Sequence, residues 1–297
     1  MDKYNLGHQH SDVNAFELWG QDRTWIIDRG KFGGTVQEAQ SCILIDGISA
    51  FSAGRNSWPS TPGRFVEFRD ERHATIACGD AKPFFEWSFN PPEHAPKLEV
   101  KEHGVTWSDY YFPRDGEEVP AWMAFSPITL NGYGQVTPLY KMNPVRRAYR
   151  TAVLLKGEHP AVVIVDDYQK DDQPHDYLWM ANVPFKESMV VVSQDATSLV
   201  LCHKKDPDGP FLLVKVLHAV GLDGGVRLNR APYKVGKDVI PSERIEIHCS
   251  RVVAPDYRVL LYPFDAGDPV PVVDVEAERI TIGIGKQEHR LHLESLD

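Results

Sequence analysis

Val162-Val163-Ile164-Val165-Asp166-Asp167 decides the fold class of this chain, because it is a short β-branched run closed by polar residues. Such a run is typical of a buried strand that ends in a turn. Similar runs recur along the chain: Ile43-Leu44-Ile45 before Asp46-Gly47, Phe211-Leu212-Leu213-Val214 after Asp208-Gly209-Pro210, Arg258-Val259-Leu260-Leu261-Tyr262 and Ile280-Thr281-Ile282-Gly283. Many short strands with regular turn signals predict an all-β protein, a large antiparallel two-sheet β-sandwich.

Length and composition agree with this fold class. The chain has 297 residues, 42% of them hydrophobic, which is enough to bury a sizeable core, and its 22 Gly and 22 Pro leave no long stretch of helical period. We expect residues 1–297 to form a single domain. The formal net charge of -10 argues against nucleic acid as a partner. No apolar run is long enough to span a bilayer, and the polar start does not read as a signal peptide.

The four cysteines are dispersed and show no C-x-x-C spacing, which disfavours a cysteine-based zinc site. They lie in apolar, strand-like surroundings, so we predict buried free thiols, with one disulfide as the alternative. These cysteines are Cys42, Cys78, Cys202 and Cys249.

Near the start, Gly7-His8-Gln9-His10-Ser11-Asp12-Val13-Asn14 places polar residues at alternate positions. Alternate side chains of a strand share a face, so two imidazoles, a carboxylate and an amide would point one way. This pattern indicates a functional edge or half of a metal site, with ordinary surface polarity as the alternative. A hairpin is predicted at Gly20-Gln21-Asp22-Arg23.

Three arginines, Arg146, Arg147 and Arg150, lie near Tyr140 and Tyr149 in the sequence. Guanidinium groups suit carboxylates and sulfates, and aromatic faces suit sugars, although a generic surface patch has the same composition.

The acidic pairs Asp166-Asp167 and Asp171-Asp172 lack a glycine-turned calcium loop, so a solvated turn after a buried strand is the favoured interpretation. We expect His175 to form hydrogen bonds inside the sandwich, with a place at a cleft rim as the alternative.

The sequence resembles the C-terminal β-sandwich of heparinase II/III-like polysaccharide lyases. The most specific block is His8-Gln9-His10-Ser11-Asp12-Val13-Asn14-Ala15-Phe16. Further blocks are Trp25-Ile26-Ile27-Asp28-Arg29-Gly30, Ser41-Cys42-Ile43-Leu44-Ile45-Asp46-Gly47, Ala77-Cys78-Gly79-Asp80-Ala81, and Val163-Ile164-Val165-Asp166-Asp167 with Pro174-His175-Asp176-Tyr177.

The resemblance implies one wall of a cleft for a uronate-containing acidic polysaccharide, the other wall being an α-helical toroid that this chain does not contain. The reaction implied is β-elimination, which needs a group that neutralises the carboxylate, a base and an acid. Most of those groups come from the toroid in this family, so we predict little or no lyase activity for this chain alone. His8 is the catalytic candidate here, and Asn14, Arg146 and Arg147 are substrate-binding candidates. The resemblance also suggests a periplasmic or secreted protein.

A zinc ion is implied as well, with His10 and Asp28 as ligands. Gln40 stands where the family usually has histidine, and an amide oxygen is a weak zinc ligand. Either the metal is absent, leaving a His–Asp hydrogen bond, or another residue such as His73 completes the site. These departures keep a second hypothesis open, a non-catalytic carbohydrate-binding or structural module. The sequence carries no G-x-S-x-G or phosphate-binding loop, and it does not decide against a two-carboxylate glycosidase.

Overall fold

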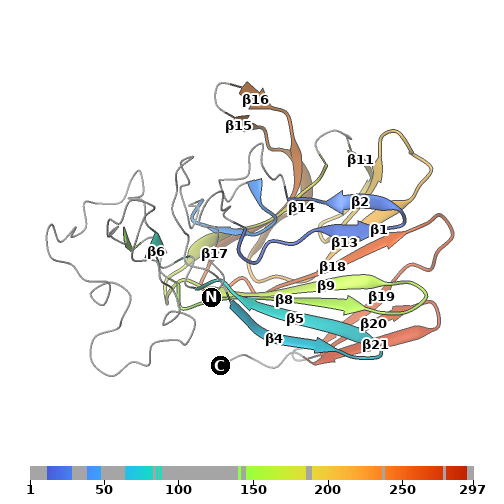
Figure 1. Cartoon of the computed structure of the whole chain (residues 1–297), viewed down its shortest axis with the longest axis horizontal. Helices are drawn as coiled ribbons and strands as arrows, with labels where there is room; N and C mark the ends of the chain where they lie inside the picture. Colours follow the sequence, from blue (N-terminus) through green and yellow to red (C-terminus); the bar gives the residue numbers. More distant parts are fainter. Residues whose placement is uncertain are drawn as a thin grey trace, which may run out of the picture.

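The computed structural model describes residues 12–28, 39–47, 64–82, 85, 87–88, 140–141, 145–184, 189–235, 238–276 and 279–292. Within these residues the protein is built from strands that pair antiparallel throughout, and two large sheets face each other (Figure 1). The all-β antiparallel sandwich predicted from the sequence is therefore confirmed. His8 and His10 lie outside the described residues, as does most of the segment 84–138.

The larger sheet has eight strands and runs from β11 at the upper right of Figure 1 to β4 at its lower edge. Its strands follow in the order β11 (Met189–Gln194), β12 (Ser198–His203), β13 (Phe211–His218), β18 (Tyr257–Phe264), β9 (Ala161–Gln169), β8 (Arg147–Leu155), β5 (Ala74–Asp80) and β4 (Arg64–Asp70).

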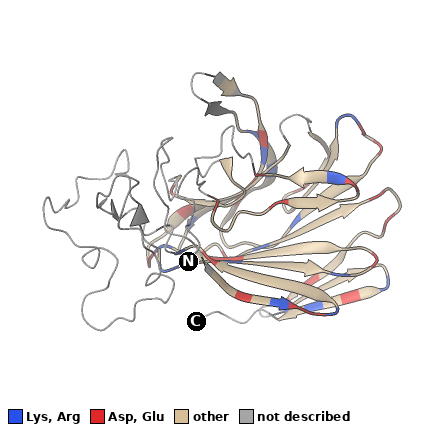
Figure 2. Ribbon diagram, viewed as in Figure 1, with Lys and Arg blue, Asp and Glu red and all other residues tan. Residues whose placement is uncertain are grey.

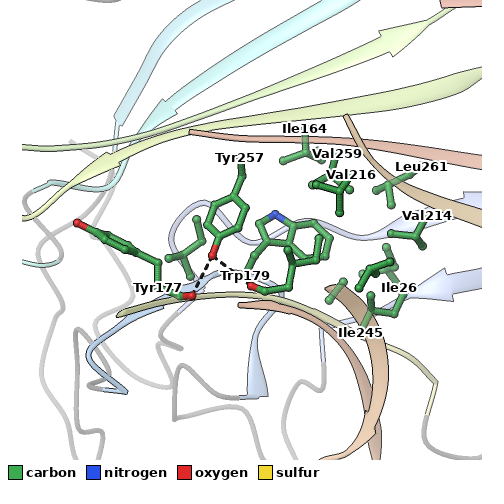
Figure 3. Packing of buried hydrophobic residues seen from close by; sticks show 14 of the residues in the cluster. Ile26, Ile164, Tyr177, Trp179, Val214, Val216, Ile245, Tyr257, Val259 and Leu261 are labelled. Atoms are coloured by element: carbon green, nitrogen blue, oxygen red, sulfur yellow. Dashed lines mark hydrogen bonds between the residues drawn. The ribbon is translucent and has the colours of Figure 1, made fainter. Parts of the chain in front are cut away.

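The smaller sheet has four strands and covers one face of the larger sheet. Its order is β14 (Leu222–Arg230), β17 (Glu243–Val252), β10 (His175–Asn182) and β3 (Ile43–Ile45). Figure 3 shows the core between the sheets, where Tyr257 from the larger sheet reaches down to Tyr177 and Trp179 of β10. The Tyr257 hydroxyl donates to the carbonyl of Tyr177 at 2.9 Å, so this buried phenol is satisfied by the opposite sheet.

A third sheet covers the other face of the larger sheet. It consists of β19 (Val272–Glu276), β20 (Arg279–Ile284) and β21 (Gln287–His292). Ile164 packs in the core toward the four-stranded sheet, whereas its neighbour Val163 packs with Ile280 and Ile282 of β20. Because both faces of β9 are buried, the strand is a continuous apolar run rather than an alternating one. The third layer is an addition to the predicted two sheets.

Three two-stranded ribbons complete the described strands: β1 (Leu18–Gly20) with β2 (Arg23–Ile26), β15 (Tyr233–Val235) with β16 (Asp238–Ile240), and β6 (Trp87–Ser88) with β7 (Tyr140–Lys141). The predicted hairpin at residues 20–23 is the β1–β2 ribbon, and both of its turn residues, Gln21 and Asp22, have positive φ. Such a two-residue turn matches the twist of the strands that it joins. A Cβ on Gly20 would lie 2.8 Å from Pro263 of β18, so glycine permits the close packing of the ribbon on the sheet.

One prediction about the strand ends is wrong. Asp166 and Asp167 do not lie in a solvated turn, because β9 continues through them to Gln169, and Asp166 is fully buried. The apolar pattern resumes at Tyr168, which is also buried. The run Val162–Val165 is therefore the middle of a strand, and Asp166 points into the space between the two large sheets.

The prediction of buried free thiols is confirmed. All four cysteines are free and buried. Basic and acidic positions are interspersed along the described strands (Figure 2). In the described part of the chain, no helix has the length and apolar character needed to cross a membrane.

Candidate functional site

The second strand of the ribbon, the strand β3 and the strand β10 meet at one corner of the sandwich. The amide of Ile27 donates to the carbonyl of Asn182 at 2.8 Å, and the hydroxyl of Ser41 donates to the carbonyl of Ile27 at 3.2 Å. The backbone amide of Asn182 donates to the same Ser41 hydroxyl at 3.0 Å. Asp28 follows Ile27 in the chain, and Gln40 precedes Ser41. These bonds therefore bring Asp28 and Gln40 to the same corner.

The two candidate ligands at this corner differ in their surroundings. Gln40 is fully buried, whereas Asp28 is half-buried. The backbone amide of Asp28 donates to the carboxylate of Glu17 at 3.0 Å, which fixes the end of the ribbon. The corner thus combines a carboxylate that solvent reaches with a buried amide.

Asn14 attaches the segment that precedes the ribbon to the larger sheet. Its side-chain amide donates to the carbonyls of Gly79 and Ala148 at 3.0 and 3.2 Å and lies 3.4 Å from the hydroxyl of Tyr168. Asn14 has φ 60, a left-handed conformation that asparagine adopts more readily than most residues. Its amide nitrogen is occupied by the protein, so Asn14 positions the segment that leads back to His10.

A buried ion pair lies directly behind this segment. Arg150 of β8 and Asp166 of β9 are both buried and form two parallel bonds, Nε to Oδ1 at 2.6 Å and Nη2 to Oδ2 at 2.9 Å. Burial opposes the charged guanidinium, but the charge of Asp166 outweighs it and raises the pKa of Arg150. The indole of Trp179 donates to the same carboxylate at 3.0 Å.

The remaining guanidinium nitrogen of Arg150 joins two chain segments to this pair. Nη1 donates to the carbonyls of Asn14 and Ser41, both at 2.7 Å. The ring of Phe16 lies 5.2 Å from Cζ of Arg150, within the range of a cation–π contact. The buried pair therefore holds the polar N-terminal segment and the Gln40–Ser41 segment against the larger sheet.

The other two arginines of the predicted cluster are ion-paired at the same end of the sheet as Asn14. Arg147 lies 2.5 Å from Asp167, with both side chains one-third exposed, and Arg146 pairs with the exposed Asp172. Such pairs contribute little to stability, and both terminal nitrogens of Arg146 are already bonded to Asp172. The role of Arg146 and Arg147 in substrate binding stays a prediction.

His175 lies between two carboxylates at the start of β10. Its Nδ1 is 2.9 Å from Asp46 and its Nε2 is 2.9 Å from Asp171. Lys170 donates to the same Asp46 carboxylate at 2.6 Å. His175 is therefore hydrogen-bonded as expected, but to partly exposed carboxylates at the end of the sheet rather than inside the sandwich. These bonds link the end of β3 to the turn between β9 and β10.

His73 is not brought to the corner that holds Asp28 and Gln40. It precedes β5, where its carbonyl accepts a hydrogen bond from Lys156. Arg150, which bonds to Ser41 at the corner, is paired with Gly79 of β5. Gly79 lies six residues beyond His73 in the chain, so His73 and Gly79 are roughly 20 Å apart at the usual rise per residue.

Among the described residues, no group of three or more His, Cys, Asp or Glu side chains is arranged to hold a metal ion. Asp28 supplies one carboxylate, and Gln40 supplies an amide that zinc binds weakly. The described residues therefore do not by themselves fit a zinc ion, and zinc at His10 stays a prediction.

Sequence reasoning missed the polar residues that this site depends on. The sequence places Arg150 in one cluster with Arg146 and Arg147 and predicts a turn at Asp166, whereas both Arg150 and Asp166 are buried. The signal was present in the spacing, because Ile164, Asp166 and Tyr168 alternate onto one face of a strand whose apolar character resumes after the aspartates.

No family model matches the sequence, and neither does any curated protein. The fold, by contrast, is that of a polysaccharide-lyase β-sandwich. Heparan sulfate lyase HepC from Pedobacter heparinus matches with a TM-score of 0.59 and 10% identity, over 96% of this chain and 37% of that chain. Two heparinase III structures match with TM-scores of 0.57 and 0.55, at 11% and 8% identity, over 96% of this chain and 36% of theirs.

These likenesses confirm the resemblance at the level of fold. The chain spans little more than a third of the length of the structures that it matches. This proportion is consistent with a β-sandwich region and leaves the activity of those whole enzymes as a proposal for this chain.

Proposed function

We propose that this chain forms one wall of a binding cleft for a uronate-containing acidic polysaccharide, with His8, His10, Asp28 and Gln40 at the binding corner. The single observation that carries the proposal is the junction of Ile27, Ser41 and Asn182. It gathers at one corner two chain segments that the family resemblance assigns to one site.

The proposed chemistry is β-elimination when the wall is paired with an α-helical toroid. In this role His8 acts as an acid, a base or a donor to the uronate carboxylate, because a histidine near neutral pH can serve each purpose. Asp28 and Gln40 orient the segment that bears the histidines. No step of this proposal passes through a metal ion.

The test is binding of the purified chain to heparan sulfate, hyaluronan, chondroitin, alginate and ulvan, measured by retardation in gels that contain each polymer. We expect retention by at least one polymer and a loss of affinity of about tenfold in His8→Ala or His10→Ala, the size of one lost charge-assisted hydrogen bond. His292→Ala, at an exposed position of β21, is the matched control and leaves affinity unchanged. Lack of retention by every polymer would contradict the proposal.

The elimination half of the proposal has its own measurement, the ultraviolet absorbance of the unsaturated uronate product. We expect no product from the isolated chain and product when a toroid is supplied. Product formed by the pure chain would show that the sandwich carries a complete set of catalytic groups.

A second function, a non-catalytic carbohydrate-binding or structural module, is favoured by Gln40 in place of histidine. Affinity for uronate oligosaccharides that survives both histidine substitutions would support this module over the lyase wall.

A further inference from the structure

A row of polar side chains crosses the four-stranded sheet on the face turned away from the core. Asn182 of β10 and Asn229 of β14 are both paired in register with Arg244 of β17. Directly opposed side chains lie about 5 Å apart at Cβ. Ile245 belongs to the core, so alternation places Arg244 and Glu246 on the opposite face with the two asparagines.

Glu246 fixes the orientation of Arg244 in this row. Arg244 donates through Nε to one carboxylate oxygen, and Asn229 donates to the other. Burial alone would raise the pKa of Glu246, but hydrogen bonds from His248 and Asn229 and the charge of Arg244 lower this pKa to about 2. The carboxylate is therefore ionised at neutral pH and holds the guanidinium by one edge.

Two groups of the row are not used within the described part of the chain. Among these residues Arg244 donates only through Nε, and none of them is an acceptor for its two terminal nitrogens. The side chain of Asn182 is fully buried, and neither its amide nitrogen nor its amide oxygen has a hydrogen-bond partner among the described residues. An unsatisfied buried amide costs about 1–3 kcal/mol, which favours a further partner. Because the side chain is fully buried, an external ligand contacts it only when neighbouring groups move aside.

We propose that Arg244 and Asn182 form a subsite for the carboxylate of a uronic acid. The planar terminal nitrogens of an arginine match the two oxygens of a carboxylate, and the amide of Asn182 supplies a further donor. Because Glu246 already holds Arg244, little side-chain entropy is lost on binding. Asn182 also bonds to Ile27 at the corner, so the subsite extends the proposed binding surface across β10 and β17.

This inference rests on the proposed function for its ligand class, and its test uses alginate oligosaccharides, which carry uronates and no sulfate. In calorimetric titrations of the full chain, Arg244→Gln is expected to weaken binding by about tenfold or more. Arg244→Lys keeps the charge but loses the planar fork, and we expect it to weaken binding nearly as much. Arg290→Gln, at an exposed ion pair of β21, is the control and stays within about twofold of the unmodified chain.

Comparing ligands distinguishes recognition of a carboxylate from recognition of a sulfate or of the neutral sugar. Dextran sulfate, which carries sulfates and no carboxylate, and neutral dextran are expected to bind weakly and without dependence on Arg244. Equal loss of dextran sulfate and alginate binding in Arg244→Gln would overturn the assignment to uronate. Unchanged alginate affinity in both Arg244 variants, with thermal unfolding confirming that they fold, would overturn the subsite.

A second readout separates this inference from the proposed function. Free glucuronate is titrated into isotope-labelled protein while the side-chain amide resonance of Asn182 is followed. A shift that Arg244→Gln abolishes supports the subsite even where no polysaccharide is retained. Retention that depends on His8 but not on Arg244, without a glucuronate shift at Asn182, overturns the subsite and leaves the proposed function standing.

Discussion

Two arginine–carboxylate pairs lie on the two large sheets of this molecule. Arg150 and Asp166 on the eight-stranded sheet are buried between the layers, and every guanidinium nitrogen of Arg150 donates to a carboxylate or a carbonyl. Arg244 and Glu246 on the four-stranded sheet lie on the outward face, and Arg244 uses only its Nε among the described residues. All three guanidinium nitrogens thus form hydrogen bonds at Arg150, whereas only one does so at Arg244 among the described residues.

The difference separates a group that holds the fold from a group that is available to a ligand. A buried charge is tolerated only when most of its hydrogen bonds are made, as at Arg150, where all three nitrogens donate. An arginine that is held by one edge and keeps its terminal nitrogens unbonded has capacity left for an anion. Substitution of Arg150 should therefore change stability, whereas substitution of Arg244 should also change ligand binding.

The largest effect is expected at the buried pair. Arg150→Met leaves Asp166 as an uncompensated buried charge and removes the donor to two backbone carbonyls. We expect the free energy of unfolding, measured by urea titration, to fall by about 3–5 kcal/mol.

The double variant Arg150→Met with Asp166→Leu is the control, because it removes both charges and fills the space with apolar atoms. It should recover most of the loss caused by the single change. A single variant within about 1 kcal/mol of the unmodified chain would show that the pair does not hold the layers together.

The pair of Arg244 and Glu246 should make the free energy of unfolding depend on pH. Glu246 has its pKa lowered from 4.5 to about 2, so its stabilisation, at most about 3 kcal/mol, is complete above pH 4.5 and lost as the pH falls toward 2. Glu246→Gln removes this contribution. Urea titrations should show a gap between the two proteins at pH 7 that closes below pH 4.5, and a gap of constant size would contradict the assignment.

A smaller effect is expected where the N-terminal segment is attached. Asn14→Ala removes the hydrogen bonds to Gly79 and Ala148 and places alanine in a left-handed conformation. We expect a loss of about 2 kcal/mol in the free energy of unfolding. Asn14→Gly loses the same amide but tolerates the conformation, so it should cost less. Equal losses in the two variants would show that the backbone conformation is not strained.

The sequence predicted the fold class because strand-length apolar runs and turn residues are local signals. The run 162–165, the hairpin at residues 20–23 and the four buried thiols all needed only neighbouring residues to be recognised. The third sheet escaped prediction because burial of both faces of β9 depends on Ile280 and Ile282, more than a hundred residues away.

The candidate site was predicted less completely. Asp28 and Gln40 were found from the resemblance, and the junction at Asn182 brings them together through a strand far along the chain. Nothing local marks Asn182 or Arg244, since each becomes notable only through its partner across β10 and β17. Polar residues whose role depends on register between distant strands are therefore the ones that a single sequence leaves out.

The smallest effect, and the one with the opposite sign, is expected at Asn182. Asn182→Leu replaces an amide without partners in the described structure by an apolar side chain of similar size. Removing the buried unsatisfied atoms should raise the free energy of unfolding by about 1 kcal/mol while it lowers affinity for uronate oligosaccharides. Urea titration and calorimetry on one preparation measure both quantities. A variant that loses both stability and affinity would place Asn182 with Arg150 among the residues that hold the fold. Replacing a structural amide lowers the free energy of unfolding of the unliganded protein, whereas replacing an amide that serves only the ligand does not.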